Sequence, residues 1–389
     1  MKRIYKNLTY LKNSQLDPFE FELLSDITII IFTKNRKLFL ERQIKWWLKF
    51  PVKLLILDGS DKDEYLKETF KQNNNINYIK ELRVSSRMKI ASENITTKYA
   101  AISGDDDFYL ISALLECIKF LEQNSEFVSC LPQFLDFDVS KKEVLFKNSY
   151  LESINFEISS DNVTERVCQK MSPYTVASFY SVQRSSTLIN SLKLGIEGDD
   201  IEYHRNPKSL LEISIEISTA LQGKMSSINQ VGYLRSNENF QIDFITRSNI
   251  TYKDWLTDEY RNERTFWINC FLNIFNNKFS YLELQNILQI AIFKYASQIK
   301  SEVSGFNFLS YLREFPGKMI KRLPFILRRI ILKLYIMSKH DSRDIIYSYN
   351  SRENLALDKN GYLNLEDKKV FERDLQEVSQ FVANSSQSL

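Results

Sequence analysis

The sequence predicts an α/β fold built on a parallel sheet, and two observations in its first part carry this prediction. The segments Asp26–Phe32 and Val52–Asp58 are nearly continuous in apolar residues, as strands covered on both faces are. Between them, Arg36–Lys49 carries apolar residues once per helical turn, which predicts an amphipathic helix. A strand, a helix and a second strand make a βαβ unit, whose crossover is expected to be right-handed.

The same alternation continues to about residue 240, and each further element follows from its own pattern. Short apolar or β-branched runs predict strands at 76–79, 98–103, 126–137, 142–146 and 228–234. Apolar residues at the helical period predict helices at 61–72, 109–123, 161–171, 184–194 and 207–221. From residue 251 onward the pattern is almost entirely helical. The predicted organisation is a leader over 1–25, an α/β domain over 26–240 and a helical region over 241–389.

Composition excludes several classes of protein. Of the 389 residues, 43% are hydrophobic and 26% are charged, which is typical of a folded chain rather than a disordered one. The net charge is only +3, so nothing global favours binding to nucleic acid. Four cysteines that fit no zinc-binding spacing favour a reducing compartment. Neither a secretory signal nor an apolar run of membrane-spanning length occurs, so the expected location is the cytoplasm.

The most informative motif is a run of three aspartates, Asp105, Asp106 and Asp107, after the strand expected at 98–103. In open α/β sheets, ligands bind beyond the carboxyl ends of the strands. Adjacent carboxylates repel one another and need a cation or strong donors nearby. Oxygen-only ligands favour Mg²⁺ or Mn²⁺ over zinc. A turn or a helix N-cap is the alternative interpretation, since aspartate is common before helices.

Polar residues follow the first two strands as well. They are Thr33, Asn35 and Arg36 after the first strand, and Asp58 and Ser60 after the second. Because all these strands are expected to end at one edge of the sheet, the loops should meet there. Asp58 can accept hydrogen bonds from a base or a ribose. Arg36, with Arg87 or Lys89, can face a diphosphate, whose charge is usually stabilised by a metal and a cationic side chain.

The order of these motifs (a strand, T-x-N-R, a strand, L-D-G-S, then a strand leading to D-D-D-F) resembles the family 2 glycosyltransferases of GT-A fold. The resemblance covers about residues 26–240 and is greatest to the bacterial enzymes of surface-polysaccharide assembly. It implies that Asp105 and Asp107 bind Mn²⁺ or Mg²⁺ on a nucleotide-sugar diphosphate, and that Asp106 faces the ribose or the sugar. It also implies nucleotide contacts at the residues after the first two strands, namely Thr33, Asn35, Arg36, Asp58 and Ser60.

The sequence departs from this family where the catalytic base is expected. An acidic pair, Asp199 and Asp200, is followed by His204, but the next predicted helix resembles the acceptor-side helix of the family more closely. Glu212 and Glu216 are four residues apart on that helix and so share one face. Either can be the base that removes the proton of the acceptor, and Glu212 is preferred because it is nearer the helix start. An exposed helix face is the alternative.

A basic amphipathic helix is expected at 317–340. It holds seven lysines and arginines and no acidic residue, interleaved with large apolar residues, and Pro324 is expected to kink it or to start a new helix. Such a helix can lie in the headgroup plane of an anionic membrane. A core helix with snorkelling basic side chains is the alternative. The hypothesis is a peripheral protein on the inner face of the cell membrane.

These features predict a metal-dependent glycosyltransferase that moves a sugar from a nucleotide-diphosphate donor to a glycan or lipid-linked acceptor. The expected reaction is a single displacement with inversion, in cell-surface polysaccharide synthesis. A nucleotidyltransferase or phosphosugar transferase on a similar sheet would share the nucleotide and metal loops without needing Glu212. A non-catalytic, membrane-associated assembly protein is a second alternative, against which the intact aspartate run argues.

Overall fold

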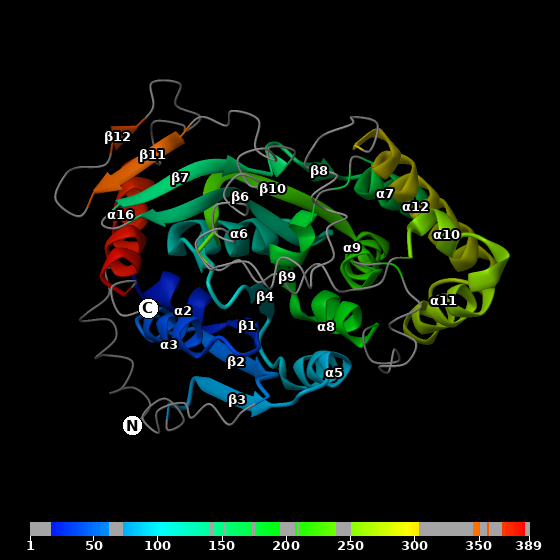
Figure 1. Ribbon diagram of the computed structural model, residues 1–389, viewed down its shortest axis with the longest axis horizontal. Coiled ribbons are helices and arrows are strands. Elements are labelled where there is room, and N and C mark those ends of the chain that lie inside the picture. The colour runs from blue at the N-terminus through cyan, green and yellow to red at the C-terminus, as the bar shows by residue number, and fades with distance from the viewer. Residues whose placement is uncertain are drawn as a thin grey trace, which may run out of the picture.

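The structure is a computed structural model, and it describes the larger part of the chain. The described residues are 17–61, 73–140, 143–150, 153–172, 174, 176–194, 207, 210–238, 250–302, 345–350, 356–357 and 368–385. They form a central sheet with helices on both faces and a helical unit at one end, which Figure 1 shows at the right. The α/β class predicted from the sequence is confirmed, as is the mostly helical character of the described residues after 251.

Four parallel strands make up one half of the sheet. They are β1 (Ile27–Thr33), β2 (Lys53–Asp58), β3 (Ile76–Lys80) and β4 (Tyr99–Ser103). Their spatial order is β3–β2–β1–β4, so β1 lies between β2 and β4. Each overlaps a strand that the sequence predicts, and α3 (Lys37–Trp47) connects β1 to β2 as the predicted helix. Because the four strands run the same way, their carboxyl ends gather at one edge of the sheet.

The other half of the sheet is mostly antiparallel and is built around two long strands, β6 and β10. Its members are β5 (Phe108–Tyr109), β6 (Phe127–Ser140), β7 (Glu143–Ser149), β8 (Glu157–Ile158), β9 (Val182–Arg184), β10 (Lys224–Ser236), β11 (Ile345–Asn350) and β12 (Ala356–Leu357). The strand β9 joins the two halves by pairing antiparallel with both β4 and β6. The strand β10 lies parallel to β6 and antiparallel to β5, where Tyr233 is opposite Tyr109. The end of β10 is therefore placed beside the residues that follow β4.

Helices cover both faces of the sheet (Figure 1). Those packed on the sheet are α2 (Pro18–Ser25), α3, α5 (Val84–Asn94), α6 (Ile111–Gln123), α8 (Ser185–Lys193), α9 (Leu210–Gln222) and α16 (Lys368–Ser385). On β1, Ile29 and Ile31 are buried in the core that contains α3 and α6, whereas Ile30 is buried with α5 and α8 on the opposite face. Burial on both faces explains the continuous apolar run at 29–32 of this strand.

The helix α5 is an element that the sequence does not predict. Its apolar stripe is narrow, because Met88 and Ala91 are buried while Val84 is exposed. Two helices near the ends of the described chain also join the sheet core. The helix α2 lies within the segment expected as a leader, yet it buries Leu24, and α16 packs against α6 and β7 and buries Val378. Tertiary packing decides α5 more than local pattern does, whereas α2 begins with a capping box between Asp17 and Glu20.

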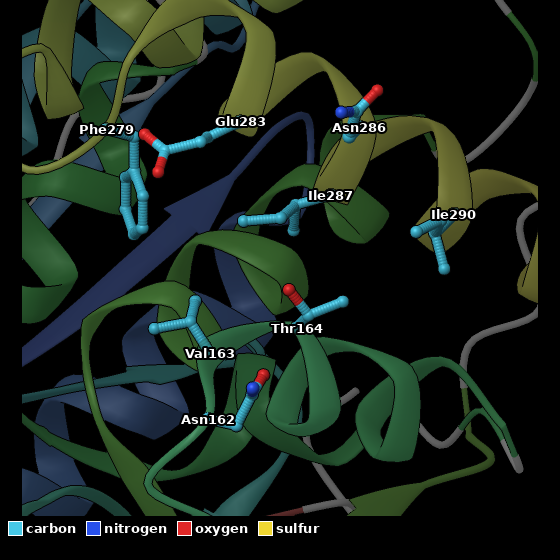
Figure 2. Close-up of a pocket in the computed structure, with 8 residues that line it drawn as sticks. All are labelled: Asn162, Val163, Thr164, Phe279, Glu283, Asn286, Ile287 and Ile290. Carbon is cyan, nitrogen blue, oxygen red and sulfur yellow. The ribbon is translucent and has the colours of Figure 1, made fainter.

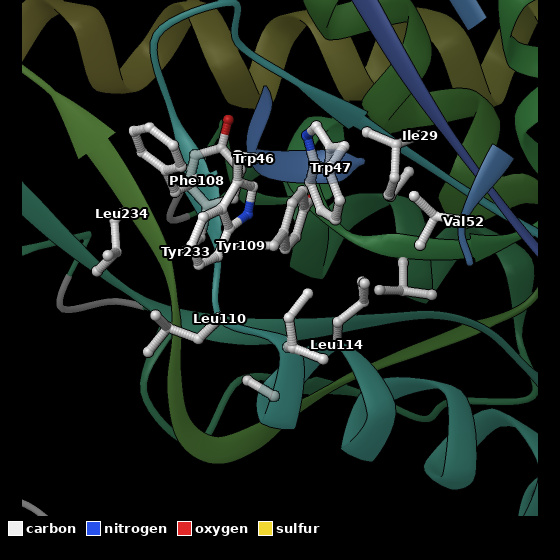
Figure 3. Close-up of a cluster of buried hydrophobic side chains, with 14 of the residues drawn as sticks. Ile29, Trp46, Trp47, Val52, Phe108, Tyr109, Leu110, Leu114, Tyr233 and Leu234 are labelled. Carbon is white, nitrogen blue, oxygen red and sulfur yellow. The ribbon is translucent and has the colours of Figure 1, made fainter. Parts of the chain in front are cut away.

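Aromatic side chains form the centre of this core and hold the chain next to the three aspartates (Figure 3). Trp46 and Trp47 come from α3, Phe108 and Tyr109 from β5, and Tyr233 from β10, and all five are buried. The rings of Trp46 and Phe108 meet edge to face at 5.7 Å, and those of Tyr109 and Tyr233 at 4.7 Å. Such pairs contribute about 0.5–1.5 kcal/mol each beyond the burial of their surface. These contacts therefore anchor Phe108 and Tyr109, which directly follow the three aspartates.

The helical unit has a core of its own. Its elements are α7 (Val163–Met171), α10 (Tyr252–Trp255), the 3₁₀ turn η5 (Asp258–Tyr260), α11 (Arg261–Phe275) and α12 (Tyr281–Glu302). Trp255, Phe271 and Leu288 are buried in it, and α9 lies between this core and the sheet. The 3₁₀ segment η2 (Val176–Tyr180) lies instead against α9 and the strands β4 and β6. Most of the helix predicted at 61–72 and all of the basic helix predicted at 317–340 lie outside the described residues. None of the helices that are described is long and apolar enough to cross a bilayer.

Candidate active site

The loops after β1 and β2 are tied together at the carboxyl edge of the parallel strands. Thr33 and Asp58 are opposite each other in register, and the N–H of Gly59 donates to the carbonyl oxygen of Thr33 at 2.9 Å. Asn35 has a positive φ of 57°, a conformation that asparagine tolerates better than most residues. This turn directs its N–H to the hydroxyl oxygen of Ser60 at 2.8 Å. The two loops that the sequence assigns to a nucleotide therefore form one surface.

Asp58 is buried at the end of β2 and is fixed by three hydrogen bonds. Its Oδ1 accepts from the N–H of Ser60 at 2.8 Å and from the Ser60 hydroxyl at 2.5 Å, and its Oδ2 accepts from the Tyr78 hydroxyl at 2.6 Å. An ionised carboxylate offers about four acceptor positions, so capacity for one more donor remains. Tyr78 comes from β3, and nothing in the local sequence marks it as a site residue.

Arg87 reaches the same loops from α5. Its Nη1 donates to the carbonyl oxygen of Thr33 at 3.0 Å, and its guanidinium lies against Gly59, where an added Cβ would come within 2.7 Å of Cζ. Only glycine permits this close approach. Burial lowers the pKa of Arg87, and the nearby charge of Asp58 opposes the shift. Lys89 is exposed two residues further along α5, and such a step leads to roughly the opposite face of a helix.

The first two aspartates of the run face the loop after β1. Asp105 accepts the hydroxyl of Thr33 at 2.6 Å and forms an ion pair with Arg36. The same guanidinium reaches Oδ2 of Asp106 at 2.7 Å. All three aspartates are buried, so a single arginine, one-fifth exposed, bridges two carboxylates that are almost without solvent. Thr33, Arg36, Asp105 and Asp106, which sequence reasoning assigned to the site separately, are thus brought together.

Asp107 turns toward β10 instead. Its Oδ2 accepts the hydroxyl of Tyr233 at 2.7 Å, and its Oδ1 accepts the N–H of Ser236 at 2.8 Å. The side chain folds back over Gly104, where an added Cβ would lie 2.4 Å from Oδ2. Arg235, next to Ser236, pairs with the buried Asp136 at 2.9 Å. Sequence reasoning missed Tyr233 and Ser236, because only the pairing of β10 with β5 and β6 brings them to the aspartates.

The three carboxyl groups carry more negative charge than Arg36 can balance. Burial raises the pKa of Asp105 to about 7, against the opposing effect of Arg36, and repulsion from Asp106 adds to the rise. Burial likewise raises the pKa of Asp107 to about 8, again with a contribution from Asp106. Burial is the main cause of these shifts, and Arg42 and Arg235 oppose the rise at Asp106 and Asp107, as a bound cation also would.

The aspartates fit a hard divalent cation in the kind of ligand they offer. Carboxylate oxygens suit Mg²⁺ and Mn²⁺, and the guanidinium of Arg36 marks a position between Asp105 and Asp106 where positive charge is held. Among the residues that the structure describes, no group of three or more His, Cys, Asp or Glu side chains is arranged to hold a metal ion. The remaining ligands would have to be donor phosphates and water, as is usual for Mg²⁺.

Without a cation, the free energy of unfolding is expected to fall as the pH rises from about 5 to about 8. An aspartate in the unfolded chain titrates near pH 4, whereas Asp105 and Asp107 hold their protons to about 7 and 8 in the folded state. Between these limits the folded state binds more protons than the unfolded state, so stability decreases with pH. Urea unfolding in EDTA across this range measures the slope. Asp107→Asn, which cannot titrate there, should flatten it, and a slope of opposite sign would contradict the assignment.

Glu216, one of the two glutamates predicted as the base, is enclosed in the protein. Its Oε2 lies 2.7 Å from Nζ of Lys170, and both side chains are fully buried. Its Oε1 accepts the N–H of Phe179 at 2.9 Å. The ion pair with Lys170 and the hydrogen bond from Phe179 explain how Glu216 is buried, because a carboxylate with both kinds of partner can remain charged in the interior. Among the described residues, Glu216 therefore exposes no surface at which an acceptor hydroxyl could meet it.

Glu212 lies one turn earlier on α9 and is partly exposed. Burial raises the pKa of Tyr180 well above its ordinary value, and the charges of Asp107 and Glu212 both add to that rise. The charges of Glu212 and Asp107 thus act on the same tyrosine, as they also do on Tyr150. The acidic pair Asp199 and Asp200, the alternative for the base, lies outside the described residues, as does His204.

A surface pocket of about 380 Å³ lies elsewhere, between the start of α7 and the helix α12 (Figure 2). Asn162, Val163 and Thr164 form one side of it, and Glu283 and Ile287 are on the other. No predicted site residue lines this pocket, so it belongs to the helical unit rather than to the edge of the parallel strands.

Neither a family model nor a curated protein matches the sequence. Among solved structures, the chain is similar to crystal structures of TarS from S. aureus, each 12% identical to it. TarS residues 1–349 in complex with UDP-GlcNAc give a TM-score of 0.45 over 93% of this chain and 91% of that chain. A structure of TarS 1–349 gives 0.40 over 73% and 93%, and one of TarS gives 0.38 over 73% and 56%. Likenesses at this level carry no conclusion about function.

Proposed function

We propose that the chain is a glycosyltransferase that uses a nucleotide-diphosphate sugar as donor. The observation that carries the proposal is the meeting of three loops at the carboxyl edge of the parallel strands. Asp58, at the end of β2, offers a fixed acceptor suited to a base or ribose. Arg36 follows β1, the neighbour of β2, and forms a charged centre with Asp105, which follows β4. This is the arrangement that the resemblance to family 2 glycosyltransferases implies for Thr33, Asn35, Asp58 and the aspartate run.

The chain's own residues have distinct roles in this proposal. Asp58 and Ser60 bind the nucleoside, with Tyr78 and Arg87 holding their loop. Arg36 provides positive charge for the diphosphate as it leaves. A divalent cation held by Asp105 and Asp107 would supply further positive charge to that leaving group. Glu212 removes the proton of the acceptor hydroxyl as it attacks the anomeric carbon, and one displacement of this kind inverts the configuration.

A screen of nucleotide sugars, with released nucleoside diphosphate as the readout, tests the proposal. We expect one donor class to give a release that depends on a glycan or lipid-linked acceptor and on Mn²⁺ or Mg²⁺. Release of pyrophosphate from a sugar phosphate and a nucleoside triphosphate would instead support the nucleotidyltransferase alternative. Absence of both products, with no nucleotide-dependent heat in calorimetry, would favour a non-catalytic assembly protein.

We further propose that residues 317–340 bring the enzyme to an anionic membrane that carries its acceptor. The support is compositional: seven basic residues and no acidic one, in a chain whose net charge is +3. Each basic residue near an anionic surface contributes about 1 kcal/mol. Replacing Lys321, Arg322, Arg328 and Arg329 with Gln should therefore release the protein from anionic vesicles in co-sedimentation, and salt should have the same effect. Binding that survives both changes would contradict this proposal.

A further inference from the structure

The buried ion pair between Lys170 and Glu216 joins two elements that flank the candidate active site. Lys170 is on α7 and Glu216 is on α9, and Nζ of Lys170 also lies 5.1 Å from the ring centre of Phe156. Removing two charges completely from water is unfavourable unless geometry and further hydrogen bonds are good. A buried ion pair of this kind therefore adds little net stability. Its role lies in what its two side chains hold in place.

The second bond of Glu216 leads toward the site. Its Oε1 accepts the N–H of Phe179, so the carboxylate ties α9 to the 3₁₀ segment η2. The next residue, Tyr180, accepts the hydroxyl of Tyr109 on its carbonyl oxygen at 2.7 Å. Its ring stacks on that of Tyr233, with 4.7 Å between the ring centres and 30° between the planes.

Tyr233 is the residue that binds Asp107. Its hydroxyl donates to Oδ2 of Asp107 at 2.7 Å, and the N–H of Gly104 donates to that same hydroxyl at 3.1 Å. A continuous series of contacts thus runs from Glu216 through Tyr180 and Tyr233 to the aspartate run. The charge of Glu212, one turn before Glu216 on α9, acts on the same Tyr180.

We infer that Glu216, neutralised by Lys170, is a positioning residue: it holds η2 so that Tyr180 supports Tyr233 and thereby the carboxylate of Asp107. The part of this inference that concerns turnover rests on the proposed glycosyltransferase function. The part that concerns the placement of η2 stands on geometry alone. The hydrogen bond from Phe179 is the decisive contact, since the ion pair only permits Glu216 to be buried.

Two double variants separate the hydrogen bond from the charges. Lys170→Met with Glu216→Gln removes both charges but keeps an acceptor for the N–H of Phe179. Lys170→Met with Glu216→Leu removes the charges and the acceptor. Replacing a whole buried pair by uncharged side chains of similar size is often nearly neutral for stability, so both should fold. The measurements are hydrogen exchange of the amides of 176–180, and kcat with the donor KM.

We expect the Gln double variant to resemble the wild type in both measurements. The Leu double variant should exchange the amides of 176–180 about tenfold faster or more, and lose about tenfold or more in kcat at an unchanged donor KM, because a buried amide loses its partner. Equal exchange in the two double variants would overturn the inference. Faster exchange with unchanged kcat would overturn the link from η2 to the reaction.

A single variant tests the same link if the Leu double variant does not fold. Tyr180→Leu leaves Lys170 and Glu216 in place and removes the ring that stacks on Tyr233. It should lower kcat without raising exchange in α7 or α9, and an unchanged kcat would overturn the inference. If the wild type transfers no sugar from any donor, the proposed function fails, but the exchange comparison still decides the placement of η2.

Discussion

Glu212→Gln is expected to lower kcat by about a hundredfold to ten-thousandfold while donor binding stays close to that of the wild type. Gln keeps the shape of the side chain but cannot take the proton of the acceptor hydroxyl. Glu212 is partly exposed, and its charge, like that of Asp107, acts on Tyr180. Turnover at saturating acceptor, together with calorimetry of donor binding, separates a loss of chemistry from a loss of affinity.

The matched control for this variant is Glu116→Gln, which removes an equivalent charge from the exposed pair with Lys119 on α6. An exposed pair of this kind contributes little to stability, so this control should keep full turnover. If Glu212→Gln also keeps full turnover, the base lies elsewhere. Asp199 and Asp200 then become the next residues to replace.

The strand-end residues could be predicted from the sequence because local patterns determine them. Continuous apolar runs mark strands buried on both faces, and parallel strands bring their carboxyl ends to one edge. Thr33, Asp58 and Asp105 are therefore placed together as soon as the βαβ alternation is recognised. Register confirms this placement, since Thr33 is opposite Asp58 on the neighbouring strand.

The partners of these residues could not be predicted, since they come from distant parts of the chain. Tyr78 meets Asp58 because β3 is the next strand of the sheet, and Tyr233 meets Asp107 because β10 pairs with β5. Neither tyrosine stands in a recognisable motif. Helical spacing also placed Glu212 and Glu216 on one face correctly, but spacing does not tell how deeply each end of that face is buried.

Asp107→Asn is expected to remove most of the response of turnover to Mn²⁺ and to lower kcat by about a hundredfold or more. The change keeps the size of the side chain and removes the charge that a cation requires. Tyr233→Phe is the matched control, because it removes the hydrogen bond at 2.7 Å to the same carboxylate and leaves the charge in place. A single hydrogen bond to a charged group contributes about 1.5–3 kcal/mol, so this control should lose some turnover but retain its dependence on Mn²⁺.

Titration of Mn²⁺ in the presence of a nucleoside diphosphate gives a second readout that does not depend on turnover. The wild type and Tyr233→Phe should both show heat from the cation, and Asp107→Asn should show little. Asp105 is already paired with Arg36. In the described structure no arginine bridges Asp107, so binding of the cation should depend mainly on the carboxylate of Asp107. If Asp107→Asn binds Mn²⁺ as the wild type does, Asp107 supports β10 rather than a metal, and Arg36 supplies the positive charge that bridges Asp105 and Asp106.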